Sequence, residues 1–252
     1  IKVDKHSTGG VGDKTTLAVA PLVAACGGRV AKMSGRGLGF TGGTIDKLES
    51  IPGMQTAISE ERFFEIVNDI GLSVIGQSAE IAPADKKLYA LRDVTATVDS
   101  IPLIAASIMS KKLASGSDKI VLDVTVGSGA FMKNIDDAIC LAQRMVEIGE
   151  NAGRQTVAIL TNMDVPLGEA VGNDIEVVEA IETLQGKGPE DFRQICVEFA
   201  AYMLYLGDIA DLETSRKMVE DAIDYGKGID KLAAMVKAQG GDESYIYHPE
   251  KF

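Results

Sequence analysis

Residues 5–13 read Lys-His-Ser-Thr-Gly-Gly-Val-Gly-Asp, and an apolar helical pattern follows directly at residues 15–26. A glycine-rich turn that opens onto a helix gathers several backbone N–H groups and the positive end of the helix dipole at one point. The side chains in or beside the turn add a cation and two hydroxyl donors: Lys5, Ser7 and Thr16. His6 can exchange a proton near neutral pH. The stretch therefore predicts a bound anion beside an acid–base group.

Helical and β-rich patterns alternate beyond this turn. Strands are predicted at Arg29–Met33, Leu72–Ile75, Ile120–Val124 and Thr156–Leu160. Helices are predicted at Thr15–Cys26, Ile45–Ser50, Arg62–Ile70, Ile135–Gly149 and Asp174–Leu184, with two helical stretches in 84–115 and a helical pattern throughout 190–237. This alternation is typical of an α/β fold with a mostly parallel sheet and helices on both faces.

A second glycine-rich loop follows the first predicted strand and spans residues 34–44, Ser-Gly-Arg-Gly-Leu-Gly-Phe-Thr-Gly-Gly-Thr. Ligands of parallel sheets bind beyond the carboxyl ends of the strands, which is where this loop is expected. Cationic and hydroxyl side chains lie in or beside the two loops: Lys5, Ser7, Thr16, Lys32, Ser34 and Thr44. Neither loop has the Gly-Lys-Ser/Thr of a Walker motif, so a small phosphate is expected rather than the tail of a nucleotide.

The helical stretch at 86–117 interrupts the alternation. It predicts an α/β phosphate-binding domain made of residues 1–85 and 118–252, with residues 86–117 as the inserted part of a small all-helical lobe. The first loop follows the chain start without an evident strand or helix before it, and residues 245–252 resemble a linker. We therefore expect a piece of a longer protein, without the parent's N-terminal helical segment and C-terminal domain.

Composition excludes several classes of protein. The 252 residues include 46% apolar residues and carry a formal net charge of −12, which argues against nucleic acid or an anionic membrane as the main partner. The longest apolar stretches, 17–26 and 101–109, are too short to cross a bilayer. Cys26, Cys140 and Cys196 lie far apart among apolar residues, so buried thiols in a reducing cytoplasm are expected.

Several stretches of the chain resemble the thymidine and pyrimidine-nucleoside phosphorylase family. They are residues 4–13, 32–39 with 41–49, 82–86 and 89–100. The motifs are long and ungapped, and the similarity covers nearly the whole chain. Residues 32–34, Lys-Met-Ser, and 186–191, Gly-Lys-Gly-Pro-Glu-Asp, are closer to the bacterial pyrimidine-nucleoside enzymes than to strict thymidine phosphorylases.

The resemblance implies an enzyme of pyrimidine salvage, a pentosyltransferase. Its reaction is the reversible phosphorolysis of uridine, thymidine or deoxyuridine, in which phosphate attacks C1′ with inversion and gives the free base and a (deoxy)ribose 1-phosphate. Phosphate is the co-substrate, and no organic cofactor is expected. The isolated chain is expected to turn over poorly.

The resemblance also implies roles for particular residues. Phosphate would be held by Lys5, Ser7, Thr16, Lys32, Ser34 and Thr44. The base would be contacted by Tyr89, Arg92, Ser107 and Lys111. His6 would donate a proton to the leaving base oxygen. The spacing of Ser107 and Lys111 independently supports their shared role in contacting the base, because residues four apart lie on the same face of a helix.

A monovalent cation is a further implication of the resemblance. In the pyrimidine-nucleoside branch a metal ion, usually potassium, bridges the first loop to a later segment. By motif, its ligands would be the backbone carbonyls of Gly12, Lys14, Leu167 and Ala170 and the carboxylate of Glu179. Oxygen-only ligation suits a hard ion, and the alternative is that Glu179 is an ordinary exposed acid on a helix. The resemblance also implies a homodimer formed through the helical lobe and a cytoplasmic location.

Two positions depart from the family pattern. Phe40 stands where the family usually has His, and Thr125 stands where it usually has Lys. Both positions are expected close to the cleft, so the loss of an imidazole and an ammonium group is expected to weaken the handling of sugar or phosphate.

Two other functions stay open. Anthranilate phosphoribosyltransferase has a similar two-lobe fold and a Gly-Thr-Gly-Gly-Asp loop, but it is disfavoured by His6 and Ser7 before the glycines and by the set at 92, 107 and 111. The other is a non-catalytic domain that binds phosphate or a nucleoside.

Overall fold

The computed structural model describes residues 1–37, 42–76 and 82–252, without the side chains of Lys86, Tyr89, Ala90 and Asp93. The predictions for Phe40 and for the Tyr89 side chain therefore lie outside the described residues.

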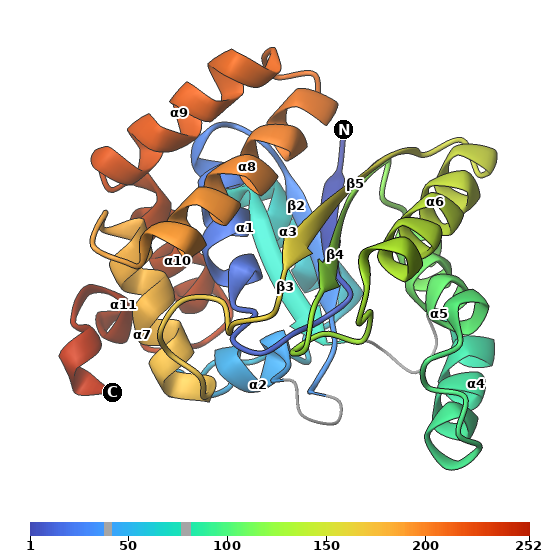
Figure 1. The fold of residues 1–252 in the computed structure, drawn as a ribbon. Coiled ribbons are helices and arrows are strands. Elements are labelled where there is room, and N and C mark those ends of the chain that lie inside the picture. The colour runs from blue at the N-terminus through green and yellow to red at the C-terminus, as the bar shows by residue number, and fades with distance from the viewer. Residues whose placement is uncertain (38–41, 77–81) are drawn as a thin grey trace.

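Parallel strands form the centre of the fold (Figure 1). They are β1 (Val3–Ser7), β2 (Val30–Ser34), β3 (Leu72–Gly76), β4 (Lys119–Val126) and β5 (Gln155–Asn162). One ladder has the order β1-β4-β5, and β2 pairs with β3 in a second ladder. β1 runs beside β2, where the Val3 N–H donates to the Arg29 carbonyl at 3.5 Å. The predicted single sheet is thus divided at β1 and β2, while its parallel character is confirmed.

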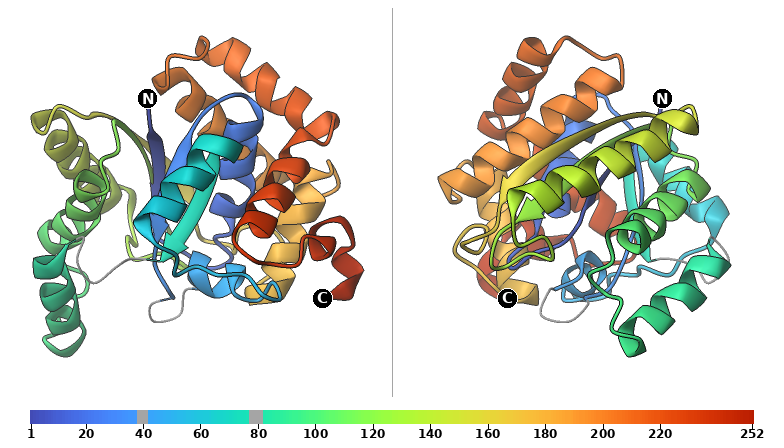
Figure 2. Two further views of the ribbon diagram at one scale, coloured as in Figure 1. Left: turned by 180° about the vertical axis from the view of Figure 1, so that it is seen from behind. Right: turned by 45° about the vertical axis from the view of Figure 1, so that its right-hand side comes forward.

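Helices cover both sides of these strands. They are α1 (Thr15–Ala25), α2 (Thr44–Leu48), α3 (Glu60–Ile70), α4 (Pro83–Val94), α5 (Ile101–Ala114), α6 (Ile135–Asn151), α7 (Asn173–Leu184), α8 (Glu190–Leu206), α9 (Leu212–Asp224), α10 (Lys227–Ala238) and α11 (Ser244–Tyr247). In Figure 1, α4, α5 and α6 lie to one side of the strands, and α1 and α7–α11 lie to the other. α3 packs on β2 and β3, as the view from behind shows (Figure 2). The predicted α/β class is confirmed.

Helix α3 begins and ends where its sequence signals predict. The Ser59 side chain accepts a hydrogen bond from the Arg62 backbone N–H at 3.2 Å, and Glu60 and Glu61 lie in the first turn, where acids are favoured by the helix dipole. Gly71 ends the helix in the left-handed conformation, at φ 100°. This local chemistry sets the position at which β3 starts.

β1 corrects the expectation that no strand precedes the first loop. Its two buried polar residues, Asp4 and Lys5, each have partners distant in sequence. Asp4 pairs with Lys112 at 2.6 Å and with Lys32 at 3.3 Å, and Lys5 pairs with Asp123 at 3.0 Å. A strand whose buried charges are neutralised in this way carries no apolar run by which the sequence could reveal it.

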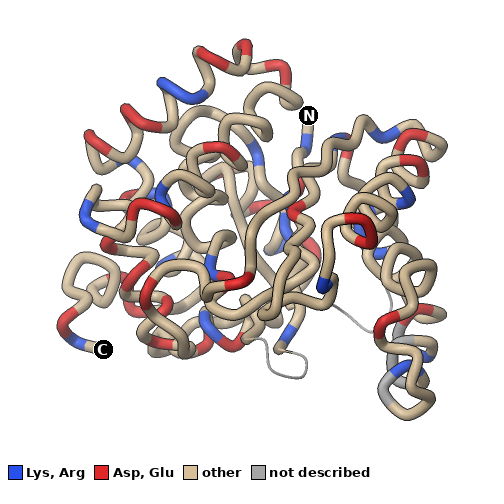
Figure 3. The backbone as a smooth tube through the Cα atoms, in the orientation of Figure 1, with Lys and Arg blue, Asp and Glu red and all other residues tan. Residues whose placement is uncertain are grey.

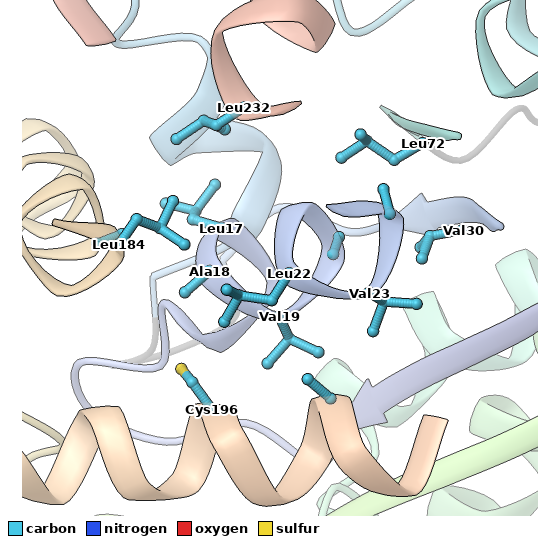
Figure 4. Packing of buried hydrophobic residues seen from close by; sticks show 14 of the residues in the cluster. Leu17, Ala18, Val19, Leu22, Val23, Val30, Leu72, Leu184, Cys196 and Leu232 are labelled. Carbon is cyan, nitrogen blue, oxygen red and sulfur yellow. The ribbon is translucent and has the colours of Figure 1, made fainter. Parts of the chain in front are cut away.

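The main core surrounds α1, in which residues 15–24 are all buried. Figure 4 shows Leu184 of α7 and Leu232 of α10 near its side chains, with Cys196 of α8 on the other side. A helix buried on every side has no polar face, which explains the apolar run after the first loop. The core therefore holds the first turn of α1 in place.

A second apolar cluster joins α5 and α6 to β4. It includes Met109 of α5, Leu122 of β4 and Leu141 of α6, all fully buried or nearly so. The cluster fixes α5 against the sheet, and α5 carries two of the predicted base-binding residues.

Two further expectations are wrong. Cys140 is exposed, because it lies on the outer face of α6; Cys26 is half-buried and Cys196 is buried. The segment expected to be a linker packs on the protein instead, as α11 with Ile246 fully buried. The apolar residues next to Cys140 in the sequence predict burial, but the helical periodicity of α6 places this side chain on the exposed face.

Charged positions are interspersed along the outer helices (Figure 3). Among the residues described, no helix is both long and apolar enough to cross a membrane.

Candidate active site

A cleft opens beyond the carboxyl ends of β1 and β2, between the two glycine loops and α5. Its wall on the α/β side includes the predicted phosphate residues Ser7, Thr16, Lys32, Ser34 and Thr44. Its opposite wall includes the predicted base residues Arg92, Ser107 and Lys111. His6 lines the same cleft. The structure thus brings together segments that are about a hundred residues apart in the sequence.

The first loop is held by a pair of threonine hydroxyl groups. Thr125 Oγ1 donates to the Gly9 carbonyl at 2.6 Å and lies 2.9 Å from Thr8 Oγ1. Thr8 Oγ1 also accepts from the Thr125 backbone N–H at 3.0 Å. In the part of the chain that the structure describes, Thr125 is buried behind the loop and does not line the cleft. Its hydroxyl therefore supports the loop from behind.

Lys32, the middle residue of β2, supplies a positive charge to the wall of the cleft. Its ammonium group donates to Asp4 Oδ1 at 3.3 Å and to the Lys5 carbonyl. Burial lowers the pKa of Lys32 to about 8, against the opposing effect of Asp4. The group is therefore still protonated at neutral pH and can attract an anion.

The Lys5 side chain lies in the core behind the first loop. Its ammonium group pairs with Asp123 at 3.0 Å and with Asp13 at 4.0 Å, and it bonds to Thr15 Oγ1. Burial alone would lower the pKa of Lys5, but Asp13 and Asp123 raise it above its usual value. Lys5 is absent from the described wall of the cleft, because these two carboxylates hold it in the core.

The α5 wall presents a linked pair of polar side chains. Lys111 Nζ donates to Ser107 Oγ at 2.9 Å and to Asp85 Oδ2 of α4 at 3.0 Å. Burial lowers the pKa of Lys111, against the effect of Asp85. Arg92 reaches the Val98 carbonyl at 2.5 Å and is 8% exposed. Hydroxyl, ammonium and guanidinium donors therefore face the cleft from one side.

His6 lies among positive charges. Burial lowers the pKa of His6 well below 6.5, and the nearby ammonium groups of Lys112, Lys32, Lys111 and Lys5 lower it further. The imidazole is consequently neutral at pH 7 in the free protein. A neutral imidazole still has one N–H to donate.

The two glycine loops are tied together by Lys47 of α2. Its buried ammonium group donates to the Asp13 carbonyl of the first loop at 2.8 Å and to the Gly42 carbonyl of the second loop at 3.0 Å. It also pairs with Glu176 of α7 at 3.1 Å. One cation thus fixes the relative position of the two loops that line the cleft.

The residues predicted to bind potassium lie together, but a side chain occupies their centre. The Lys14 ammonium group donates to the carbonyls of Leu167 at 2.8 Å and Ala170 at 2.9 Å, and it contacts the Glu179 carboxylate. A Cβ on Gly12 would lie 2.7 Å from the Leu167 oxygen. Glu179 is 5% exposed, so the alternative of an exposed helix acid is wrong. A metal ion does not fit this donor set while the ammonium group fills it.

Several wall residues were not predicted: Thr8, Asp13, Arg36, Ile104, Ile108 and Phe131. The two isoleucines had a signal in the sequence, because 104, 107, 108 and 111 follow helical spacing and share one face. Asp13 and Arg36 belong to the glycine loops. Phe131 carries no local signal, since only the folding of the loop after β4 brings it to the cleft.

The chain is similar to known proteins along its whole length. Residues 1–229 match the family described as "Glycosyl transferase family, a/b domain". The whole chain is 58% identical to a pyrimidine-nucleoside phosphorylase of Geobacillus stearothermophilus and 60% identical to one of Staphylococcus epidermidis. It spans 58% of the length of each of these curated relatives. This similarity confirms the resemblance predicted from the motifs.

A solved structure shares the fold. The crystal structure of anthranilate phosphoribosyltransferase from Thermus thermophilus matches with a TM-score of 0.73, over 94% of this chain and 78% of that chain. The sequences are 17% identical, so this likeness concerns the fold alone.

Proposed function

This chain belongs to the glycosyl transferase family whose a/b domain matches residues 1–229, and from that premise we propose that it catalyses the reversible phosphorolysis of pyrimidine nucleosides. The substrates would be uridine, thymidine or deoxyuridine with inorganic phosphate, and the products the free base and a pentose 1-phosphate, in pyrimidine salvage. The enzyme would be a pentosyltransferase.

One observation carries the proposal: a single cleft joins the two donor sets that this reaction needs. Hydroxyl groups and an ammonium group line the wall formed by the glycine loops, and Arg92, Ser107 and Lys111 line the opposite wall. His6 lies in the same cleft. Phosphate and base can therefore be held at the same time with the sugar between them.

The phosphate wall would orient the nucleophile. The hydroxyl groups of Ser7, Thr16, Ser34 and Thr44 would donate to the phosphate oxygens, and Lys32 would balance part of the charge. One phosphate oxygen would then attack C1′ from the face opposite the base. The new O–C1′ bond forms as the C1′–N1 bond breaks, and the electron pair of the broken bond leaves with the base.

The opposite wall would stabilise the negative charge that develops on the base. Lys111 and Arg92 are cations in a partly buried site, where electrostatic stabilisation is stronger than in water. Ser107 would add a hydroxyl donor, and His6 would donate to the base oxygen. The apolar side chains of Ile104 and Ile108 would limit the access of water to the sugar.

Four parts of the proposal rest on the resemblance. They are the assignment of residues 86–117 to a helical lobe, a homodimer formed through that lobe, a cytoplasmic location and the contact of Tyr89 with the base. No step is assigned to a metal ion, because the Lys14 ammonium group fills the donor set that the resemblance gave to potassium.

Separate KM values for the two substrates test the division of the cleft. Ser107→Ala should raise the KM for the nucleoside about tenfold, the effect of one lost hydrogen bond, and leave the KM for phosphate unchanged. Ser34→Ala should do the reverse. Ser110→Ala is the matched control, because Ser110 bonds only to the helix carbonyl of Ser107 in the described contacts and does not line the cleft. Equal effects of the first two variants on both KM values would contradict the proposed division.

A further inference from the structure

Lys14 and its surroundings carry an inference that does not depend on the proposed reaction. Its side chain is completely buried between the first glycine loop and the segment before α7. Its ammonium nitrogen lies 2.8 Å from the Leu167 oxygen and 2.9 Å from the Ala170 oxygen, and it contacts Glu179 Oε2. The ring of Phe192 lies 5.3 Å away, within the range of a cation–π contact.

We propose that the ammonium group of Lys14 is a built-in cation, which takes the position of the monovalent metal ion and makes this protein independent of one. An ammonium group has three N–H donors, and three oxygen atoms surround this one. Two neutral carbonyls and one carboxylate are also the donor types that hold a potassium ion. These oxygens therefore bind the single positive charge of the Lys14 side chain in place of a metal ion.

A metal ion and this side chain exclude each other. The Glu179 carboxylate supplies one negative charge, and the Lys14 ammonium group already balances it. A second cation among the same oxygens would lie within hydrogen-bond distance of the first, where like charges in a buried site repel strongly. The Lys14 carbonyl oxygen is itself engaged, because it accepts from the Leu17 N–H at 2.9 Å at the start of α1.

The built-in cation holds the first loop against α7. Glu179 Oε1 accepts from the backbone N–H groups of Glu169 at 2.9 Å and Ala170 at 3.0 Å. The carboxylate therefore binds this segment through Oε1 and the Lys14 ammonium group through Oε2. The Leu167 N–H donates to the Val11 carbonyl of the loop at 3.1 Å. Lys14 directly precedes α1, whose first turn contributes Thr16 to the cleft. The tether is therefore permanent, whereas a bound ion could dissociate.

Thermal unfolding in different salts tests the proposal. The midpoint temperature Tm of the parent protein should be the same in potassium chloride and in choline chloride of equal ionic strength, because choline is too large for the site. Lys14→Thr should unfold about 6–15 °C lower in choline, since it leaves Glu179 buried without a cation. Potassium should restore several degrees of that loss, and rubidium should give an anomalous scattering peak at the site in crystals of the variant only.

Three further variants keep the test decisive. Lys14→Met should lose stability without any response to potassium, because its side chain still fills the space. Lys14→Met/Glu179→Gln removes both charges and should unfold at a higher temperature than Lys14→Met, again without a response. Lys237→Thr removes a surface ion pair with Glu243 and should create no potassium dependence. A potassium-specific rise in the Tm of the parent, or a Lys14→Thr variant with the parent's Tm in choline, would overturn the proposal.

Discussion

Replacing His6 by Ala should lower kcat/KM for the nucleoside by about 10²- to 10⁴-fold, the usual contribution of a positioned acid–base group. The KM for phosphate should change little, because the hydroxyl donors on the loop wall and Lys32 remain in place. Steady-state assays of base release, with each substrate varied in turn, measure both values. His248→Ala is the matched control, since that side chain is exposed near the chain end, where it pairs with Glu250. A decrease in kcat/KM of less than tenfold in His6→Ala would show that His6 is not the proton donor.

The protonation of His6 should depend on phosphate. Burial and four lysines keep the pKa of His6 well below 6.5 in the free protein. A bound phosphate dianion would oppose these positive charges and favour the imidazolium, so the pKa should rise when phosphate binds. NMR titration of the His6 ring protons, assigned by comparison with His6→Ala, measures the pKa with and without phosphate. Catalysis through the imidazolium should accordingly decline as the pH rises through the pKa of the phosphate-bound form, and an unchanged pKa would contradict this coupling.

Lys47→Met should be the most damaging substitution for stability near the site. It leaves the Glu176 carboxylate buried without its cation, and removing one partner of a buried ion pair costs about 3–5 kcal/mol. It also removes the donor shared by the Asp13 and Gly42 carbonyls, so the two loops lose their common support. We expect the KM for phosphate to rise at least tenfold, because both loops contribute donors to the phosphate wall. Urea unfolding and steady-state kinetics measure the two effects.

A double variant separates these effects. Lys47→Met/Glu176→Gln removes the unpaired charge and should recover most of the lost free energy of unfolding. The KM for phosphate should stay high, because the bridge between the loops is still missing. If the KM returned to the parent value together with stability, Lys47 would act only through overall stability and not by positioning the loops.

The elements that the sequence predicts well are those with local signals. Ser59 and Gly71 delimit α3 by side-chain capping and by a left-handed backbone, and both depend on neighbouring residues only. β4 is rich in β-branched residues, and this composition predicts a strand. β1 was missed because its burial depends on Lys32, Lys112 and Asp123, which the fold brings from distant segments.

In the site too, contacts within one helix can be predicted from the sequence, whereas contacts with distant residues cannot. Ser107 and Lys111 could be paired from their spacing, and their hydrogen bond at 2.9 Å fits that pairing. The direction of a long side chain has no such signal. Lys5 turns toward Asp123 in the core, and Lys14 reaches the carbonyls at 167 and 170, because buried carboxylates lie there in the folded protein. Sequence motifs could name these lysines but could not show which charges they would meet.

The stoichiometry of the reaction shows directly whether this chain carries out phosphorolysis. This protein is incubated with uridine or thymidine, base release is followed by absorbance, and phosphorus-31 NMR follows inorganic phosphate and pentose 1-phosphate in the same sample. We expect one phosphate to be consumed and one pentose 1-phosphate to be formed for each base released, and no base release without phosphate. Base release that does not need phosphate, or phosphate binding without any base release from either nucleoside, would contradict this expectation.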